Sequence, residues 1–377
     1  STRLRQEAAL ALAREVEAMV VVGGKNSANT ARLVRVAESA GIPAYHIETS
    51  EELDSHDLSK YSRVGVTAGA STPNWIIRDV VNYLSKIKRS GLGRLLEPLR
   101  LLIRFLALSN IYVASGAGAL TYAASLLLGV PPDWRYLVMA FLSIMSLHSI
   151  NQHLAAKQAS SMFMVSPVRF WQRLKLSTAA VSACCAVALA ITVGMFEALL
   201  VALALGVGSI YGMQVAPASF RRIVGLRSLR DIPASKDIFA AAGWAMLAAF
   251  LPTIPAWSSV TWTTLAAVFA LVFMMVYVRS TLLDVGEIEL DRAVGRETTP
   301  FVLGKRRTKF LVALFVLGML LIISVGRFSG VLPGLALWLY GVVAYTLAYL
   351  FLYHQRIVSR QIALELLADG KFLLAGF

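Results

Sequence analysis

The sequence has few cysteines, few charged residues and fewer acids than bases. Its two cysteines, Cys184 and Cys185, are adjacent within a long apolar run. Neighbouring cysteines of this kind cannot form a disulfide framework, a CxxC redox pair or a zinc site. Charged residues make up 15% of the chain, whereas soluble domains carry about 25%. Together with a hydrophobic content of 57%, this composition excludes an ordinary soluble globular enzyme.

The charge is distributed unevenly along the 377 residues, whose formal net charge is +14. Residues 1–100 contain 14 Lys and Arg against 11 Asp and Glu, whereas residues 101–377 contain 22 against 11. The second region is otherwise dominated by Leu, Ala, Val and Phe. We therefore predict two bodies that join near residue 95. They are a small α/β soluble domain over residues 1–92 and an all-α polytopic membrane domain over residues 93–377.

Apolar runs long enough to cross about 30 Å of hydrocarbon recur through the second body. They predict spans at 101–128, 134–156, 176–195, 197–216, 237–254, 259–282, 308–326 and 333–353. A ninth span is expected to begin at Lys371, where the sequence stops after seven residues. This abrupt end, and a start at Ser1 rather than at Met, favour the interpretation that the sequence is a fragment or a processed product.

The basic residues predict the orientation of these spans. Four links are rich in Lys and Arg, and they lie around 157–175, 217–236, 279–309 and 354–371. The opposite links carry only Arg135 and Arg327. By the positive-inside rule the basic links face the cytoplasm, and we expect the soluble domain on the same side of a bacterial-type inner membrane. Because topology explains the positive charge, we expect a lipid membrane as partner and no nucleic acid.

The link at 279–309 differs from the others because it contains five acids beside seven bases. Asp284, Glu287 and Asp291 are spaced i, i+3, i+7, which places three carboxylates on one helix face. Clustered carboxylates repel one another unless a cation joins them, and Mg²⁺ held by carboxylates and substrate phosphates is a common solution. Neighbouring bases such as Arg296 can bind the phosphates directly. The alternative is a solvated link that is neutralised by its own arginines.

The run DVGEIELDRAVGRETTPFVLG, residues 284–304, resembles the second aspartate motif of the UbiA superfamily of intramembrane prenyltransferases. The resemblance covers about residues 95–377 and implies an all-helical fold with nine spans. In that family two facing aspartate-rich motifs hold Mg²⁺ and a prenyl diphosphate. Ionisation of the diphosphate then alkylates an aromatic or lipid acceptor. In this sequence Glu287 replaces the usual middle aspartate.

The same resemblance implies roles for individual residues. Asp284, Glu287 and Asp291 are implied to hold the metal, and Asp284 and Asp291 are the expected catalytic acids. Tyr211, in SIYGMQVAP at the end of the fourth span, resembles a family tyrosine and is expected to help stabilise the allyl cation. The bases implied to bind the diphosphate are Arg222, in the basic segment 221–236, and Arg296.

The first aspartate motif of that family is missing. Asn151 stands where the motif begins, but the following QHLAAKQA, residues 152–159, has Gln or Ala at every aspartate position. One of the two carboxylate clusters is therefore absent. Two interpretations remain for this segment: its polar residues contact a diphosphate without a metal, or they mark the end of a helix. The residues concerned are His148, Asn151, His153 and Lys157.

The first 92 residues alternate between helical and strand patterns. Helices are predicted at 5–18, 29–41 and 73–87, and short strands at 19–24, 44–48 and 63–70. This alternation predicts a parallel sheet that is covered on both faces. Two strands run into small-residue loops, GGKNSAN and TAGAST, before a helix. Backbone N–H groups at helix starts favour anions, so we expect a phosphate cradle; the alternative is that Gly and Ser simply make tight turns.

The segments VVVGGKNSANTARL, AYHIE and VGVTAGASTPNWIIRDV resemble the carboxy-terminal third of the hydroxymethylbutenyl diphosphate reductases, the IspH or LytB family. That family uses an iron–sulfur cluster held by three cysteines. The resemblance implies that Ser27, Asn29 and Ser71 bind a substrate diphosphate, and Ala28 replaces a second serine. Residues 1–92 contain no cysteine. A cluster is therefore expected only with upstream domains, and reductase activity is excluded for this fragment alone.

Three hypotheses follow. The first is an integral-membrane enzyme that moves a prenyl group, not a methyl group, from a prenyl diphosphate to an aromatic or lipid acceptor in the bilayer, using Mg²⁺. The second is a fragment of a 4-hydroxy-3-methylbut-2-enyl diphosphate reductase, of isoprenoid precursor synthesis, fused to a non-catalytic UbiA-like membrane domain. The third is a protein that binds isoprenoid diphosphates without turnover, or a scaffold. Two unrelated folds that handle isoprenoid diphosphates on one chain favour that ligand class.

Overall fold

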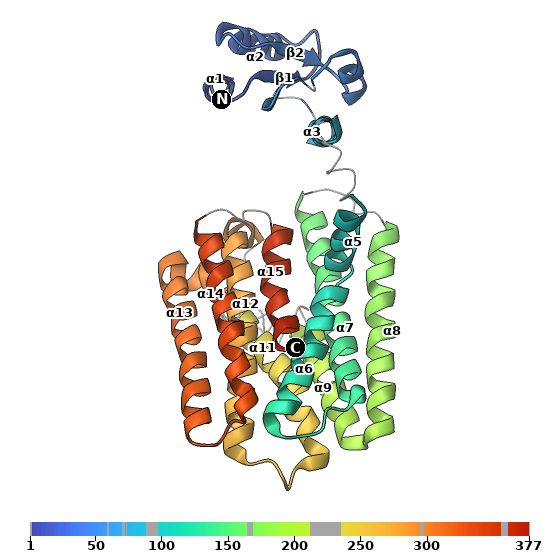
Figure 1. Cartoon of the computed structure of the whole chain (residues 1–377). Helices are drawn as coiled ribbons and strands as arrows, with labels where there is room; N and C mark the ends of the chain where they lie inside the picture. Colours follow the sequence, from blue (N-terminus) through green and yellow to red (C-terminus); the bar gives the residue numbers. More distant parts are fainter. Residues whose placement is uncertain are drawn as a thin grey trace, which may run out of the picture. The chain divides into compact units, whose positions relative to one another are not determined.

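The computed structural model describes residues 2–58, 60–69, 72, 74–87, 97–163, 169–211, 235–294, 298–355 and 361–376. The chain divides into two compact units, the head (Ser1–Leu101) and the membrane unit (Leu102–Phe377). Figure 1 shows the α/β architecture of the head and the helical architecture of the membrane unit. The predicted fold class is confirmed for both.

The head contains a three-stranded parallel sheet in the order β2-β1-β3. Its strands are β1 (Ala18–Val22), β2 (Ala44–Ile47) and β3 (Val64–Ala68). Its helices are α1 (Thr2–Ala13), α2 (Ala28–Ser39) and α3 (Asn74–Ile87), with a 3₁₀ turn η1 (Ser50–Ser55). The parallel sheet predicted from the strand–helix alternation is therefore present.

The central strand β1 is buried over its whole length. Met19 and Val21 pack in the cluster formed with α1 and α2, whereas Val20 and Val22 pack in the cluster formed with η1 and α3. Side chains of a strand alternate between its two faces, so these clusters lie on opposite faces of the sheet. A parallel strand buried on both faces is apolar without interruption, which explains the run MVVV.

The membrane unit is a bundle in which helices that follow one another in the chain pack side by side (Figure 1). In chain order the helices are α5 (Glu97–Leu108), α6 (Ile111–Leu128), α7 (Trp134–Phe163), α8 (Arg169–Val193), α9 (Met195–Tyr211), α11 (Ser235–Ala245), α12 (Trp262–Val294), α13 (Thr299–Phe328), α14 (Leu339–His354) and α15 (Gln361–Ala375). After α11 the chain forms a π turn η3 (Met246–Phe250) and a 3₁₀ turn η4 (Leu251–Ala256), and η5 (Gly334–Trp338) precedes α14. The last helix, α15, packs against α6 and so closes the bundle into a ring.

Within the described ranges, six segments are long and apolar enough to cross a membrane. They are Ile111–Leu128, Gln172–Val193, Ser235–Ala256, Trp262–Val285, Thr299–Phe328 and Gly334–His354. The shorter Met195–Ser209 is also apolar. These segments correspond to predicted spans, so the polytopic character of this unit is confirmed.

The starts of α7 and α12 and the turn η5 lie at one end of the bundle, the lower end in Figure 1. Trp134 begins α7, Trp262 begins α12 and Trp338 ends η5, and all three are exposed. Tryptophan is enriched where a membrane meets water, because its ring is apolar and its N–H is polar. About 22 helical residues, or some 33 Å, separate Trp262 from Asp284 along α12. The acidic motif therefore lies near the opposite end.

The carboxy-terminal helix corrects one prediction. α15 begins at Gln361, so the link expected over 354–371 and the ninth span expected to begin at Lys371 are both wrong. Asp369 and Lys371 lower the hydropathy of this segment, although both side chains are buried inside the bundle. Charged side chains within a membrane helix face the bundle interior and find partners there, which hydropathy alone does not register.

Two further boundaries differ from the prediction. The first span, expected over 101–128, is divided at Asn110, which has a left-handed backbone with φ of 64°. Asparagine tolerates this conformation better than most residues. The link expected over 279–309 is largely helical, because α12 continues to Val294. Asp284 and Asp291 therefore lie on one continuous helix, as their spacing predicted.

Candidate functional site

The membrane unit contains a cavity of about 530 Å³ between its helices. Residues of α6, α7, α9, α11, α12 and α15 line it, so it lies inside the ring that α15 closes. One end of the cavity is polar. Its polar lining residues include Asn110, His148, Asn151, Gln152, Lys236, Arg279, Ser280, Asp284, Glu365 and Asp369.

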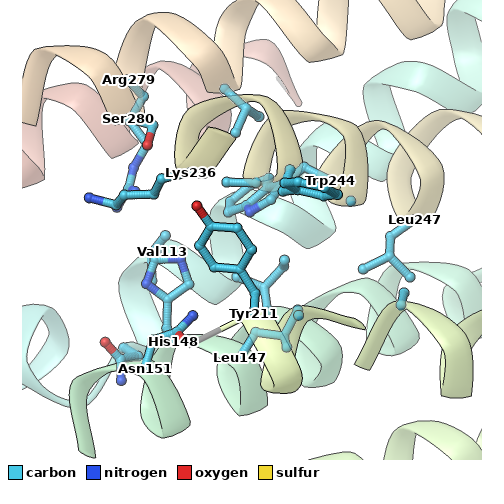
Figure 2. A pocket seen from close by; sticks show the side chains of 18 of the residues that line it. Val113, Leu147, His148, Asn151, Tyr211, Lys236, Trp244, Leu247, Arg279 and Ser280 are labelled. Atoms are coloured by element: carbon cyan, nitrogen blue, oxygen red, sulfur yellow. The ribbon is translucent and has the colours of Figure 1, made fainter. Parts of the chain in front are cut away.

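The remaining walls of the cavity are apolar. Leu147 and Val207 contribute from α7 and α9, and Trp244 and Leu247 contribute from α11 and η3. In Figure 2 Leu247 and Trp244 lie on one side of Tyr211, whereas His148, Asn151 and Lys236 lie on the other. A cavity with apolar walls and a few convergent polar groups suits a ligand with an apolar chain and a polar headgroup.

Lys236 and Asp284 form an ion pair at the polar end. The Lys236 side chain is 39% exposed, whereas the Asp284 side chain is only 2% exposed. Both residues line the cavity. The cationic member of the pair is therefore the more exposed one, and its anionic partner is nearly fully buried.

A second ion pair joins α12 to α15. Arg279 donates from Nε and Nη2 to the two carboxylate oxygens of Asp369, and the Nη2–Oδ2 distance is 3.2 Å. The two side chains are 12% and 6% exposed. Because Arg279 also lines the cavity, this two-point contact holds a guanidinium in the cavity wall.

The α7 wall presents neutral polar groups instead of carboxylates. His148 and Asn151 line the cavity. Next to them, Gln152 Nε2 donates to Asn110 Oδ1 at 2.7 Å, and Asn110 Nδ2 donates to Ser149 Oγ at 3.2 Å. These bonds tie the α5–α6 break to α7. They also explain why glutamine suits this position, because its amide completes a pair with Asn110.

Tyr211 lies at the end of α9, as predicted, and lines the cavity. It is 8% exposed. Its hydroxyl and the Ser235 hydroxyl are 2.7 Å apart, and its ring centroid is 5.4 Å from that of Phe239. Ser235 and Phe239 therefore fix the Tyr211 side chain from α11, at the wall of the cavity.

The structure brings together some of the residues that the sequence predicted. Tyr211, Asn151 and Asp284 line one cavity although they come from α9, α7 and α12. Glu287 and Asp291 lie on the helical backbone of α12, but their side chains are outside the described part of the chain. The predicted diphosphate ligands Arg222, Arg296 and Ser71, and the Lys157 side chain, are outside it as well.

The described residues do not provide the Mg²⁺ site that the sequence resemblance implies. No Asp or Glu occurs between Asp133 and Glu197, so α7 supplies no carboxylate at all. On α12 the buried Asp284 already faces the opposite charge of Lys236. Within the described ranges, no three His, Cys, Asp or Glu side chains gather closely enough to hold a metal ion. Metal binding by Asp284, Glu287 and Asp291 therefore stays a prediction.

Sequence reasoning assigned no role to several residues at the polar end, foremost Arg279 and Asp369. Both lie in or beside apolar runs, and a charged residue in a membrane helix is by itself a signal of a functional or structural site. Lys371, which donates to the Tyr349 hydroxyl at 3.1 Å, carries the same signal. The sequence therefore shows these charged residues, but it does not show which residue each of them pairs with.

In the head, the two predicted loops meet at the carboxyl edge of the sheet. Val22, the last residue of β1, accepts hydrogen bonds from Gly69 N at 2.9 Å and from Thr72 Oγ1 at 3.0 Å. At Gly23, where φ is 151°, a Cβ atom would lie 2.7 Å from Thr30 Oγ1 and 2.9 Å from Thr72 Oγ1. Only glycine suits both this backbone and this close approach.

The predicted ligands Ser27 and Asn29 lie at the start of α2 beside these loops. Ser27 is the N-cap, and its Oγ accepts a hydrogen bond from Thr30 N at 3.4 Å. Asn29 is exposed in the first turn. This arrangement satisfies one backbone donor through Ser27 and leaves the helix start at the surface, where anions are favoured.

Lys25 in the same loop is held by acids that follow β2. Its ammonium pairs with the Glu52 carboxylate at 2.7 Å, and its backbone N–H donates to Glu48. The hydrogen bond from Lys25 lowers the pKa of Glu52, and the same bond raises the pKa of Lys25. The conformation of this loop therefore depends on an ion pair at the protein surface.

Residues 1–85 match the family model described as LytB protein. The head is 53% identical over 87 residues to the 4-hydroxy-3-methylbut-2-enyl diphosphate reductase of Clostridioides difficile (strain 630), covering 23% of this chain and 31% of that protein. It is 47% identical over 87 residues to the enzyme of the same name from Aquifex aeolicus (strain VF5), covering 23% and 30%. The chain thus spans about a third of the length of these curated relatives.

The helical part of the chain is similar to a solved structure, the apo structure of a UbiA homolog from Aeropyrum pernix K1. The superposition has a TM-score of 0.51 and covers 70% of this chain and 96% of the other. The sequences are 14% identical. This likeness shows a shared fold.

Proposed function

Because the chain joins a LytB/IspH-type segment to a membrane body with the fold of a UbiA homolog, we propose that it binds a prenyl diphosphate in the cavity and transfers the prenyl group to an aromatic or lipid acceptor from the bilayer. The observation that carries the proposal is the amphiphilic lining of the cavity. Its apolar walls suit an isoprenoid chain, and Lys236 and Arg279 at the polar end suit a diphosphate.

In the proposed reaction the bond between C1 of the prenyl chain and the diphosphate oxygen breaks, and its electron pair leaves with the diphosphate. A nucleophilic atom of the acceptor then donates an electron pair to C1 and loses its proton. Lys236 and Arg279 stabilise the charge that develops on the leaving diphosphate. The ring of Tyr211 stabilises the allyl cation, and the apolar walls exclude water, which would otherwise capture it.

A pair of tryptophan substitutions on α9 tests this proposal. Ala204 lines the cavity, whereas Ala202 on the same helix is exposed on the outside. We expect Ala204→Trp to lower prenyl transfer by about a hundredfold, because the indole displaces the substrate from its reactive position. Ala202→Trp is the matched control and should leave the rate unchanged. The measurement is the conversion of radiolabelled geranylgeranyl diphosphate into phosphatase-resistant, organic-soluble product by membranes; equal rates in both variants would contradict the proposal.

A second candidate function is reduction of 4-hydroxy-3-methylbut-2-enyl diphosphate. It is favoured by the 53% identity of the head to a reductase of that name. Since residues 1–92 contain no cysteine, the iron–sulfur cluster that the resemblance implies requires ligands from outside them. Cysteine codons upstream of Ser1 in the same reading frame would support this candidate, and a start codon directly before Ser1 would contradict it.

A further inference from the structure

We propose that the polar end of the cavity binds the diphosphate headgroup directly through Lys236 and Arg279, without a divalent metal. The inference rests on the proposed function, because it concerns the headgroup of the same ligand. It departs from the Mg²⁺ site that the sequence resemblance implies, and three features of the described residues support it.

The first feature is the chemistry of the α7 wall. A metal that bridges a diphosphate to two facing helices needs oxygen ligands from both. α7 contains no Asp or Glu, and the groups that it presents to the cavity are the imidazole of His148 and the amide of Asn151. These are groups that donate hydrogen bonds to phosphate oxygens. On this side the headgroup is therefore contacted by protein donors.

The second feature is the unequal exposure of the charges that meet at α12. Asp284 and Lys236 both line the cavity, but the Asp284 side chain is only 2% exposed, whereas the Lys236 side chain is 39% exposed. A hydrated Mg²⁺ ion requires an accessible carboxylate, but the accessible group here is an ammonium. Lys236 therefore supplies the positive charge that a metal would supply, and Asp284 is its buried counter-ion.

The third feature is the arrangement of Arg279. Its Nε and Nη2 atoms are directed to Asp369, which is buried at 6% exposure. A guanidinium has five N–H groups in a rigid plane, so a two-point contact with one carboxylate leaves others for a phosphate. Glu365 also lines the cavity, and Asp284 and Asp369 are the nearly fully buried counter-ions of the two cations.

The experiment measures the affinity of the purified full chain for geranylgeranyl diphosphate, in detergent, with either MgCl₂ or EDTA. We expect the dissociation constants in MgCl₂ and in EDTA to differ by no more than about threefold. Binding that is present in MgCl₂ and lost in EDTA would overturn this inference and leave the proposed function intact. A folded protein that binds in neither solution would contradict the proposed function, and this inference with it.

Two substitutions are expected to change the dissociation constant for geranylgeranyl diphosphate differently, depending on whether the diphosphate binds the protein directly or through a metal. We expect Lys236→Met to raise the dissociation constant about tenfold or more, because a charge-assisted contact is lost. Asp284→Asn should leave it unchanged or lower it, because the anion that competes for Lys236 becomes neutral. A metal site predicts the reverse order, with loss of binding in Asp284→Asn. Lys309→Met, at an exposed lysine of α13, is the control for loss of a lysine charge.

Lys236→Met leaves the buried carboxylate of Asp284 without its cation and is expected to lower stability. The double variant Lys236→Met/Asp284→Asn removes both charges and avoids this penalty. It should unfold near the temperature of the unmodified chain and still bind at least about tenfold more weakly. Tight binding by the folded double variant would overturn the inference.

Discussion

The charged residues at the polar end of the cavity differ in how deeply their side chains are buried and in which residue they pair with. Asp284 and Asp369 are nearly fully buried, and their partners Lys236 and Arg279 are the groups that line the cavity with them. An ion pair of this kind contributes little to stability beyond what apolar packing would supply. Its value lies in holding a cation in a fixed position beside an apolar chamber.

Lys25 in the head offers a test at the scale of one side chain. We expect Lys25→Met to raise the pKa of Glu52, because the hydrogen bond from the ammonium that lowers this pKa is lost. The pair stabilises the head above the pKa that Glu52 has in the unfolded chain. This contribution disappears as the pH falls through the lower pKa of the folded state.

The measurement is a ¹³C NMR titration of selectively labelled glutamate side chains in the full chain. Lys60→Met, at another exposed lysine of the head, is the control and should leave the Glu52 titration unchanged. Identical Glu52 titrations in the Lys25 variant and the unmodified chain would show that this ion pair does not form in solution.

At the scale of elements, α15 supplies one wall of the cavity in the membrane unit. It closes the ring against α6, and it is attached to α12 and α14 through Arg279–Asp369 and Lys371–Tyr349. Polar contacts between membrane helices replace the hydrophobic effect, which does not favour helix association within lipid. The charged residues of α15 therefore place the helix, and through it the wall of the cavity.

Breaking the Arg279–Asp369 pair from one side should loosen this helix. We expect Arg279→Met or Asp369→Ala alone to lower the free energy of unfolding by about 3 to 5 kcal/mol, because each leaves a buried charge without its partner. The double variant should lose less than the sum of the two single losses. Unfolding in detergent, followed by circular dichroism, measures these differences. Additive losses would show that the two side chains do not interact.

At the scale of the whole molecule, the distribution of bases and tryptophans predicts the orientation in the membrane. The turn after α13, near Ser329, lies at the tryptophan-rich end, and Lys309 lies near the beginning of α13 at the other end. By the positive-inside rule we expect the end with Lys309 to face the cytoplasm.

Cysteine labelling in intact cells tests this orientation. In a background with Cys184 and Cys185 replaced by alanine, we expect Ser329→Cys to react with a membrane-impermeant maleimide. Lys309→Cys should react only after the membrane is permeabilised. Both positions are exposed in the folded chain, so each serves as the control for the other. The reverse pattern of labelling would overturn the predicted orientation.

Local signals in the sequence were sufficient to predict several features. The apolar runs predicted a membrane bundle, because burial in lipid demands continuous apolar segments of helical length. The alternation of short strands and helices predicted the parallel sheet of the head. Motif positions also singled out Tyr211, Asn151 and Asp284 as candidate site residues, and the three do line one cavity.

Tertiary structure decided which partner each charged residue has. Nothing in the spacing of residues indicates that Arg279 binds Asp369, 90 positions away, or that Lys236 pairs with Asp284. The helix α15 was predicted as a link for the same reason. Its charged residues lower its hydropathy, and the sequence does not show that they are buried among neighbouring helices. The spacing of apolar residues indicates which faces of a segment are apolar, and the sequence by itself determined this feature. Ion pairs between distant helices form only when packing brings them together, so the character of the polar end of the cavity was decided by the tertiary structure.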